Sequence, residues 1–157
     1  MNDSIYKITK LRPADNLPFD LLLLADETTE AIEKYVYDSD VYLVSEIELL
    51  KPIAVFVLYK ISNVEIEIKN IAVAENFQGK GIGSFLIDRI RTITSESNYK
   101  SISVGTPDSA HKQINFYEKN GFSKYSIKKD FFIKNYSKPI IEDGIVLRDM
   151  LMLRMKL

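Results

Sequence analysis

The sequence predicts a single α/β domain with a mixed, mostly antiparallel central sheet flanked by helices. The chain has 157 residues, and at about 150 residues per domain this length fits one domain spanning 1–157. Runs of β-branched and aromatic residues between 41 and 73 predict three neighbouring antiparallel strands. An amphipathic segment over 81–96 leads into a short apolar run and a second helical segment. That alternation predicts two parallel strands with helices packed on the sheet.

The first half of the chain is a series of short strands and helices separated by turn residues. The expected elements are a strand over 5–11, helices over 17–25 and 28–37, and strands over 41–47, 53–61 and 64–73. Thr28 and Thr29 are candidate caps for the second helix, because a hydroxyl there can accept a hydrogen bond from a first-turn amide. Pro52 favours a turn between the second and third strands. The last three strands therefore form an antiparallel meander.

The second half of the chain starts with the clearest helix signal, a stripe of apolar residues at helical spacing over 81–96. A strand over 100–105 follows it, and then a helix over 108–120 with Asp108 as its N-cap and Gly121 at its end. Two further strand-like segments, over 122–136 and 145–157, are expected to pair as a long hairpin.

Composition excludes several classes of function. With 21 basic and 22 acidic side chains the formal net charge is −1, so nothing draws the whole chain to nucleic acid or to an anionic membrane. The chain has no cysteine and one histidine, His111, which excludes thiol chemistry, zinc sites that contain cysteine and His-rich metal sites, and no metal is expected. Residues 1–4 lack a secretory profile, and no apolar run approaches the roughly 18 residues of a membrane span. Cytoplasmic residence is expected.

Gln78-Gly79-Lys80-Gly81-Ile82-Gly83 lies between the strand that ends near residue 73 and the amphipathic helix. Glycines at a helix N-terminus let backbone amides converge where the helix dipole favours an anion, which suits a pyrophosphate. A Walker A loop requires Ser or Thr after its lysine, and here Gly81 follows Lys80. The dinucleotide-binding pattern requires glycine where Ser84 stands. What remains is the pattern Gln/Arg-x-x-Gly-x-Gly/Ala.

This loop, together with two further blocks, resembles the Gcn5-related N-acetyltransferase (GNAT) superfamily. The blocks are Ile71-Ala72-Val73 before the loop and the run from Phe116 to Phe122 in the later helix. The resemblance implies an acetyltransferase-like fold, with acetyl-CoA as cosubstrate, the loop on its pyrophosphate and the preceding strand on its pantetheine arm. The cofactor-binding residues that it implies are Ile71, Ala72, Val73, Gln78, Gly79, Lys80, Gly81, Ile82 and Gly83.

The resemblance also implies two catalytic side chains. Glu67 lies eleven residues before Gln78, a spacing similar to that of the glutamate that serves as general base in several family members. Glu65 is the neighbouring alternative, because residues two apart on a strand share a face, and water is a third. Tyr117 stands where the family often places a tyrosine that protonates the departing thiolate of coenzyme A.

The function implied is acetyl-CoA-dependent N-acetylation of a primary amine by direct attack, the acceptor being a small molecule or a peptide. The alternative is a catalytically silent regulatory module that binds coenzyme A or acyl-CoA. Because an amine arrives as a cation, an acidic acceptor pocket is expected, with Glu27, Glu30 and Glu33 as candidates. Homodimerisation is plausible, since the family often associates through sheet edges. No nucleic acid or membrane is expected as a partner.

Overall fold

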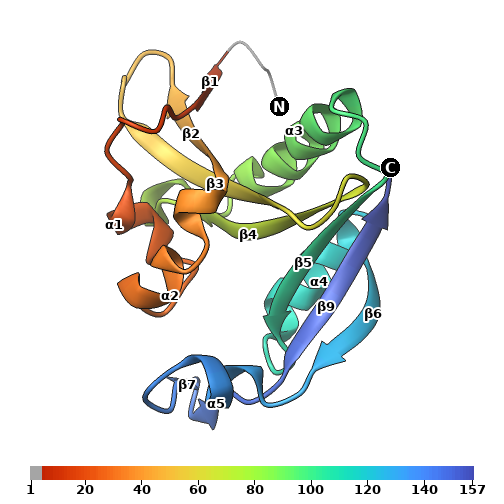
Figure 1. Cartoon of the computed structure of the whole chain (residues 1–157). Helices are drawn as coiled ribbons and strands as arrows, with labels where there is room; N and C mark the ends of the chain where they lie inside the picture. The colour runs from red at the N-terminus through yellow and green to blue at the C-terminus, as the bar shows by residue number, and fades with distance from the viewer. Residues whose placement is uncertain (1–4) are drawn as a thin grey trace.

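The computed structural model describes residues 5–157, which form one mixed seven-stranded sheet with helices on both faces and a small two-stranded hairpin (Figure 1). The strands of the large sheet follow the order β1-β2-β3-β4-β5-β9-β6. The elements are β1 (Tyr6–Lys10), α1 (Phe19–Leu22), α2 (Thr29–Glu33), η1 (Val36–Asp38), β2 (Asp40–Glu46), β3 (Pro52–Lys60), β4 (Glu65–Val73), η2 (Glu75–Phe77), α3 (Ile82–Glu96), β5 (Ser101–Pro107), α4 (His111–Lys119), β6 (Ser123–Lys128), α5 (Phe131–Asn135), β7 (Ile141–Glu142), β8 (Ile145–Val146) and β9 (Met150–Lys156).

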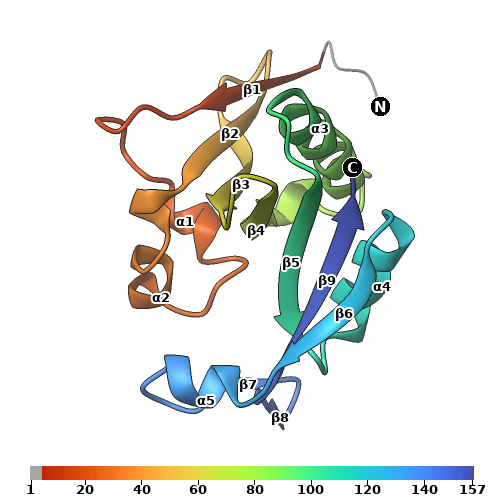
Figure 2. The ribbon, with the colours of Figure 1, turned by 45° about the vertical axis from the view of Figure 1, so that its right-hand side comes forward.

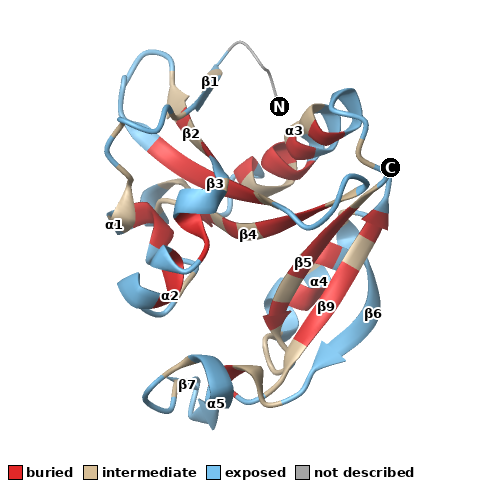
Figure 3. Cartoon of the chain, in the orientation of Figure 1, coloured by how far each residue is buried: buried red, intermediate tan, exposed pale blue. Residues whose placement is uncertain are grey.

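The predicted fold class is confirmed: β2, β3 and β4 form the antiparallel meander, and β4 and β5 are parallel neighbours. Six consecutive residues of β3, from 53 to 58, are buried. Continuous burial replaces in–out alternation because both faces of the sheet are covered. On one face α3 and α4 pack over the larger apolar core, and on the other face α1 and α2 enclose a smaller one (Figure 3).

The centre of the sheet splits between β4 and β5. Their parallel pairing covers only 65–68 of β4 and 101–104 of β5. The register between β3 and β4 shifts at the same point: Leu58 pairs with Ile68 but Val57 pairs with Asn70, which leaves Lys69 as a bulge. Beyond the bulge β4 stays with β3, while β5 pairs with β9 along its whole length. The two strands therefore diverge, as Figure 1 shows.

The predicted long C-terminal hairpin is only partly correct. β6 and β9 do pair antiparallel, but the expected strand over 122–136 ends at Lys128 and α5 follows. Asp130, with φ of 56°, starts this helix in the left-handed region, and its amide donates to the Asp149 carboxylate at 2.8 Å. The turn buries Phe132, which a continuing strand would not do. The tertiary contact overrides the β propensity of this aromatic run.

Two expectations about helix starts have different outcomes. Thr28 is confirmed as a cap, since its Oγ1 accepts from the amide of Ala31 at 3.1 Å. Asp108 as N-cap is wrong: α4 begins at His111 after Ala110, and the Asp108 amide donates instead to the carbonyl of Asp149. The preceding strand β5 runs on to Pro107, so the helix starts later than the pattern indicates.

Within residues 5–157 no helix is long and apolar enough to cross a bilayer. The expectation about a secretory signal falls on residues 1–4, which lie outside the described part of the chain.

A carboxyl pair joins the segment before α2 to β7, and it should make stability depend on pH. A hydrogen bond between Glu27 and Glu142, followed by partial burial, raises the pKa of Glu27 from 4.5 to about 7. The folded state therefore holds a proton between these values that the unfolded chain releases. This contribution to the free energy of unfolding is present at about pH 4 and is lost as the pH rises through 7.

Thermal melts of the wild type and Glu27→Gln at about pH 5 and about pH 8 check this, because the variant should lose less Tm on going to the higher pH. Glu30→Gln, an exposed neighbour, is the matched control and should keep the wild-type pH dependence. Equal pH dependence in all three proteins would contradict the assignment.

Candidate active site

The glycine-rich loop leaves its backbone exposed ahead of α3. Gly79 and Gly81 have φ of 74° and 82°, a region that glycine enters without a steric penalty. Gly81 is the N-cap of α3, and no side chain of residues 5–157 caps that helix start. The amides of 82–84 therefore face outward with the positive end of the helix dipole. A methyl group added at Gly79 would meet no atom of the described chain within 4 Å.

The Gln78 side chain holds the loop to the strand rather than pointing at a ligand. Its Nε2 donates to the carbonyl of Val73 at 2.8 Å. Lys80 also turns back, with its ammonium 5.3 Å from the ring centroid of Phe77. The backbone of this loop, more than its side chains, is therefore available to a ligand.

The second feature is the open edge of β4. The Ala74 amide donates to Ile53 of β3 at 2.8 Å, so by the alternation of an antiparallel ladder Ala72 also pairs with β3. Ile71 and Val73 then direct their backbone groups the other way, toward β5. Because β5 has already diverged, these groups border a gap rather than a neighbouring strand.

Loop and open edge meet in a groove of about 460 Å³ on the face covered by α3 and α4. Eight of the nine predicted cofactor-binding residues line it; Lys80 is the exception. Sequence reasoning predicted Tyr117 as a catalytic residue and included Phe116 in a matching block, but it missed the other lining residues, which come from the segment after α1, from η2 and from the first turns of α3 and α4. These residues are Leu24, Phe77, Ser84, Lys112 and Gln113.

Tyr117 lies in the wall of this groove, buried against aromatic neighbours. The rings of Phe116 and Phe122 sit edge-on to it at 5.3 and 5.6 Å between centroids. Burial raises the pKa of the phenol well above its ordinary value of 10.0. The hydroxyl therefore keeps its proton at neutral pH and is suited to donate it, not to act as a base.

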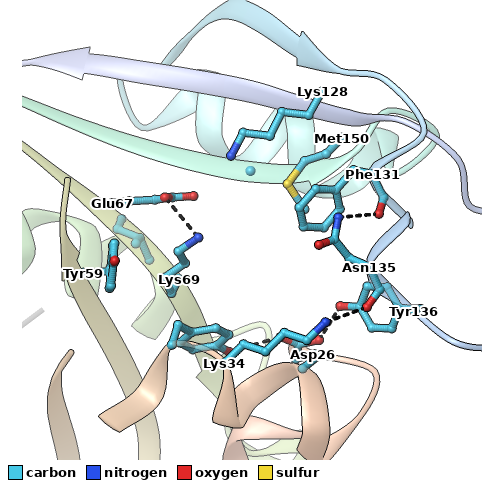
Figure 4. Close-up of a pocket in the computed structure, with 14 residues that line it drawn as sticks. Asp26, Lys34, Tyr59, Glu67, Lys69, Lys128, Phe131, Asn135, Tyr136 and Met150 are labelled. Atoms are coloured by element: carbon cyan, nitrogen blue, oxygen red, sulfur yellow. Dashed lines mark hydrogen bonds and ion pairs between the residues drawn. The ribbon is translucent and has the colours of Figure 1, made fainter. Parts of the chain in front are cut away.

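A second cavity, of about 270 Å³, reaches β4 from the opposite face (Figure 4). β4 and β5 supply its inner wall, including Glu67, Lys69 and Gly105, and α2 and α5 supply its outer walls. Its charged lining residues are Asp26, Lys34, Glu67, Lys69 and Lys128. Groove and second cavity both border β4 where it leaves β5, so one small molecule at the split could touch both.

The two candidate glutamates have different surroundings. Glu67 is only 4% exposed and lines the second cavity, with its Oε2 3.2 Å from Nζ of Lys69. Glu65 lies two residues earlier on β4, outside the lining of the second cavity, and its Oε1 accepts a hydrogen bond from Nη2 of Arg154 at 3.0 Å. The sequence could not choose between them. The geometry favours Glu67 as the carboxylate that a ligand can reach.

Contacts between α2 and α5 close the outer side of the second cavity. Asp26 accepts hydrogen bonds from the hydroxyls of Tyr136 at 2.7 Å and Tyr35 at 3.1 Å. Nζ of Lys34 donates to the carbonyl of Asn135 at 2.9 Å. The two sides of these contacts are far apart in the chain, and no sequence pattern predicts that they meet.

The three glutamates expected to line an acidic acceptor pocket lie outside the second cavity. Glu27 and Glu30 line a neighbouring cavity beside the segment 135–141, and Glu33 is exposed on α2 outside both. Among residues 5–157 no group of three His, Asp or Glu side chains could hold a metal ion.

Comparison with known proteins shows which family this chain resembles. The family model described as Acetyltransferase (GNAT) domain matches residues 38–124. The uncharacterized N-acetyltransferase YvbK of Bacillus subtilis (strain 168) is 35% identical over 139 residues, covering 88% of each chain.

Two solved structures share the fold over nearly the whole length. A GNAT family acetyltransferase from Elizabethkingia anophelis with acetyl-CoA bound is 38% identical with a TM-score of 0.92, covering 99% of this chain and 100% of that one. A Bacillus subtilis acetyltransferase in complex with CoA is 31% identical with a TM-score of 0.85, covering 97% and 99%.

Gly83 should be needed for packing, in addition to any role in the groove. A methyl group built on it would lie 3.1 Å from the Phe116 ring of α4, so Gly83→Val is expected to lower the free energy of unfolding by about 1–3 kcal/mol. Denaturant unfolding measures this. If Phe116 is the cause, the same change in a Phe116→Leu background should cost less, and an equal cost in both backgrounds would contradict the contact.

Proposed function

The chain belongs to the GNAT family of N-acetyltransferases, and from this premise we propose that it transfers the acetyl group of acetyl-CoA to a primary amine by direct attack. The observation that carries the proposal is that two cavities border neighbouring parts of β4, one on each face of the sheet, where β4 leaves β5. The groove beside the glycine-rich loop contains Tyr117, and the cavity on the opposite face contains Glu67. A cofactor in the first and an amine in the second would meet between an acid and a base.

The residues of the groove fit acetyl-CoA. The outward amides of 82–84, with open space beside Gly79, suit a pyrophosphate. Lys112 adds a cation to the lining. The backbone groups of Ile71 and the amide of Val73 suit the amides of a pantetheine arm, which would pair with β4 as a strand does. Bound there, acetyl-CoA supplies an activated acyl group as a thioester.

In the mechanism, Glu67 accepts a proton from the acceptor ammonium, directly or through water, and leaves a neutral amine. The amine nitrogen forms a bond to the thioester carbonyl carbon, and the carbon–sulfur bond breaks. Tyr117 gives its proton to the departing thiolate and regains one from solvent or from the new amide nitrogen. The chain has no cysteine, so an acetyl-cysteine intermediate is excluded.

Tyr117→Phe is expected to lower kcat by about 10²- to 10⁴-fold, because it deletes the proposed acid but keeps the ring packed between its aromatic neighbours. Steady-state kinetics with a confirmed acceptor, together with acetyl-CoA titration, provide the measurement. Tyr37→Phe is the matched control, since Tyr37 is 68% exposed and lies outside both cavities. Full kcat in Tyr117→Phe would remove its role as acid.

Glu67→Gln is expected to lower kcat by a similar factor and to flatten the pH dependence of kcat/KM, because the amide cannot accept the amine proton. Glu65→Gln is the comparison: it loses an ion pair with Arg154 but should keep most of its activity. Similar losses in both variants would assign the effect to stability rather than to a base.

The alternative is a silent module that binds coenzyme A, but such a module would have no use for the second cavity. It predicts acetyl-CoA binding without coenzyme A release in the presence of any amine. Amine-dependent release would exclude it.

A further inference from the structure

We propose that the acceptor carries an anionic group in addition to its amine, so that amino-acid-like zwitterions are used in preference to polycations. This inference deepens the proposed function and depends on it. It starts from the charge of the second cavity, whose lining holds three lysines and two carboxylates. The formal sum is 3 − 2 = +1, opposite in sign to what a purely cationic acceptor would favour.

The carboxylates in this lining are already engaged. Glu67 is paired with Lys69 at 3.2 Å. Asp26 accepts two tyrosine hydroxyls, at 2.7 and 3.1 Å. Two of the three lysines, Lys34 and Lys128, have no carboxylate partner among residues 5–157. Lys34 donates to a backbone carbonyl, which carries no net charge. Within residues 5–157, no carboxylate lies within ion-pair distance of Lys128, whose recorded contact is the Phe131 ring centroid at 5.9 Å.

Lys128 has the position that an anion-binding group would need. It stands at the end of β6, on the far side of the split from Glu67, and Figure 4 shows its side chain extending into the cavity toward the Glu67–Lys69 pair. An acceptor that directs its amine to Glu67 would therefore bring its other end within reach of Lys128. A carboxylate there gains a charge-assisted hydrogen bond, and a second ammonium meets repulsion.

The size of the cavity points the same way. About 270 Å³ lies just below the range of about 300–1,000 Å³ typical of sites for drug-sized ligands. An amino acid or a similar small metabolite fits such a volume. Polyamines and aminoglycosides would place several ammonium groups among three lysines, so charge disfavours both, and size disfavours the larger aminoglycosides.

The test is coenzyme A release from acetyl-CoA with matched acceptor pairs, each an amino acid and the amine left when its carboxylate is replaced by hydrogen. The panel also includes spermidine and an aminoglycoside. The expected result is that the pairs that react have kcat/KM at least about tenfold higher for the carboxylate member. Equal or higher values for the decarboxylated amines or the polycations would overturn the inference but leave the proposed function standing. No release with any amine would overturn both.

Lys128→Met then assigns the preference to its side chain. The ratio of kcat/KM between carboxylate and decarboxylated members should fall by about tenfold, and Lys128→Glu should lower it further toward favouring a diamine. Lys129→Met, an exposed neighbour outside the cavity lining, is the control and should keep the wild-type ratio. Thermal melts establish that each variant is folded. An unchanged ratio in Lys128→Met would contradict this role of Lys128.

Discussion

The short parallel pairing between β4 and β5 is the constraint on which the rest of the site depends. Four residue pairs hold the two strands together, and then the bulge at Lys69 keeps β4 with β3 while β5 follows β9. A continuous sheet would satisfy the backbone of Ile71 and Val73 with another strand. The divergence leaves the backbone groups of Ile71 and the amide of Val73 without a strand partner within residues 5–157, while the Val73 carbonyl accepts from Nε2 of Gln78. Cavities border β4 on both faces of the sheet at this point.

The helices give the two faces of the sheet different environments where β4 and β5 diverge. On one face, the glycine-rich loop and α3 present amides, and Tyr117 sits in an apolar wall where burial raises its pKa. On the other face, buried Glu67 and half-buried Lys69 form an ion pair near contacts that join the end of α2 to α5, which lies below α2 in Figure 2. In the mechanism that we propose, the proton donor and the carboxylate thus act from opposite faces of the sheet.

Much of this could be predicted from the sequence. The meander, α3 and the glycine-rich loop have strong local signals, because β-branched runs, helical periodicity and glycine depend little on distant residues. α5 could not be predicted, since the amide of Asp130 bonds to the Asp149 carboxylate and the amide of Phe132 bonds to the Arg148 carbonyl, and these distant contacts turn a strand-like run into a helix. The charge of the second cavity could not be predicted for the same reason. Lys34, Lys69 and Lys128 come from three separate elements and meet only in the folded chain.

We propose that acetyl-CoA binds along the open edge of β4 and the amides at the start of α3. Hydrogen–deuterium exchange of the intact protein, with and without saturating acetyl-CoA, measures whether these backbone amides become protected. We expect slower exchange at 71–73 and 79–84 on binding, with little change in β1 and β2, which lie away from the split. Binding that left exchange in both segments unchanged would contradict it.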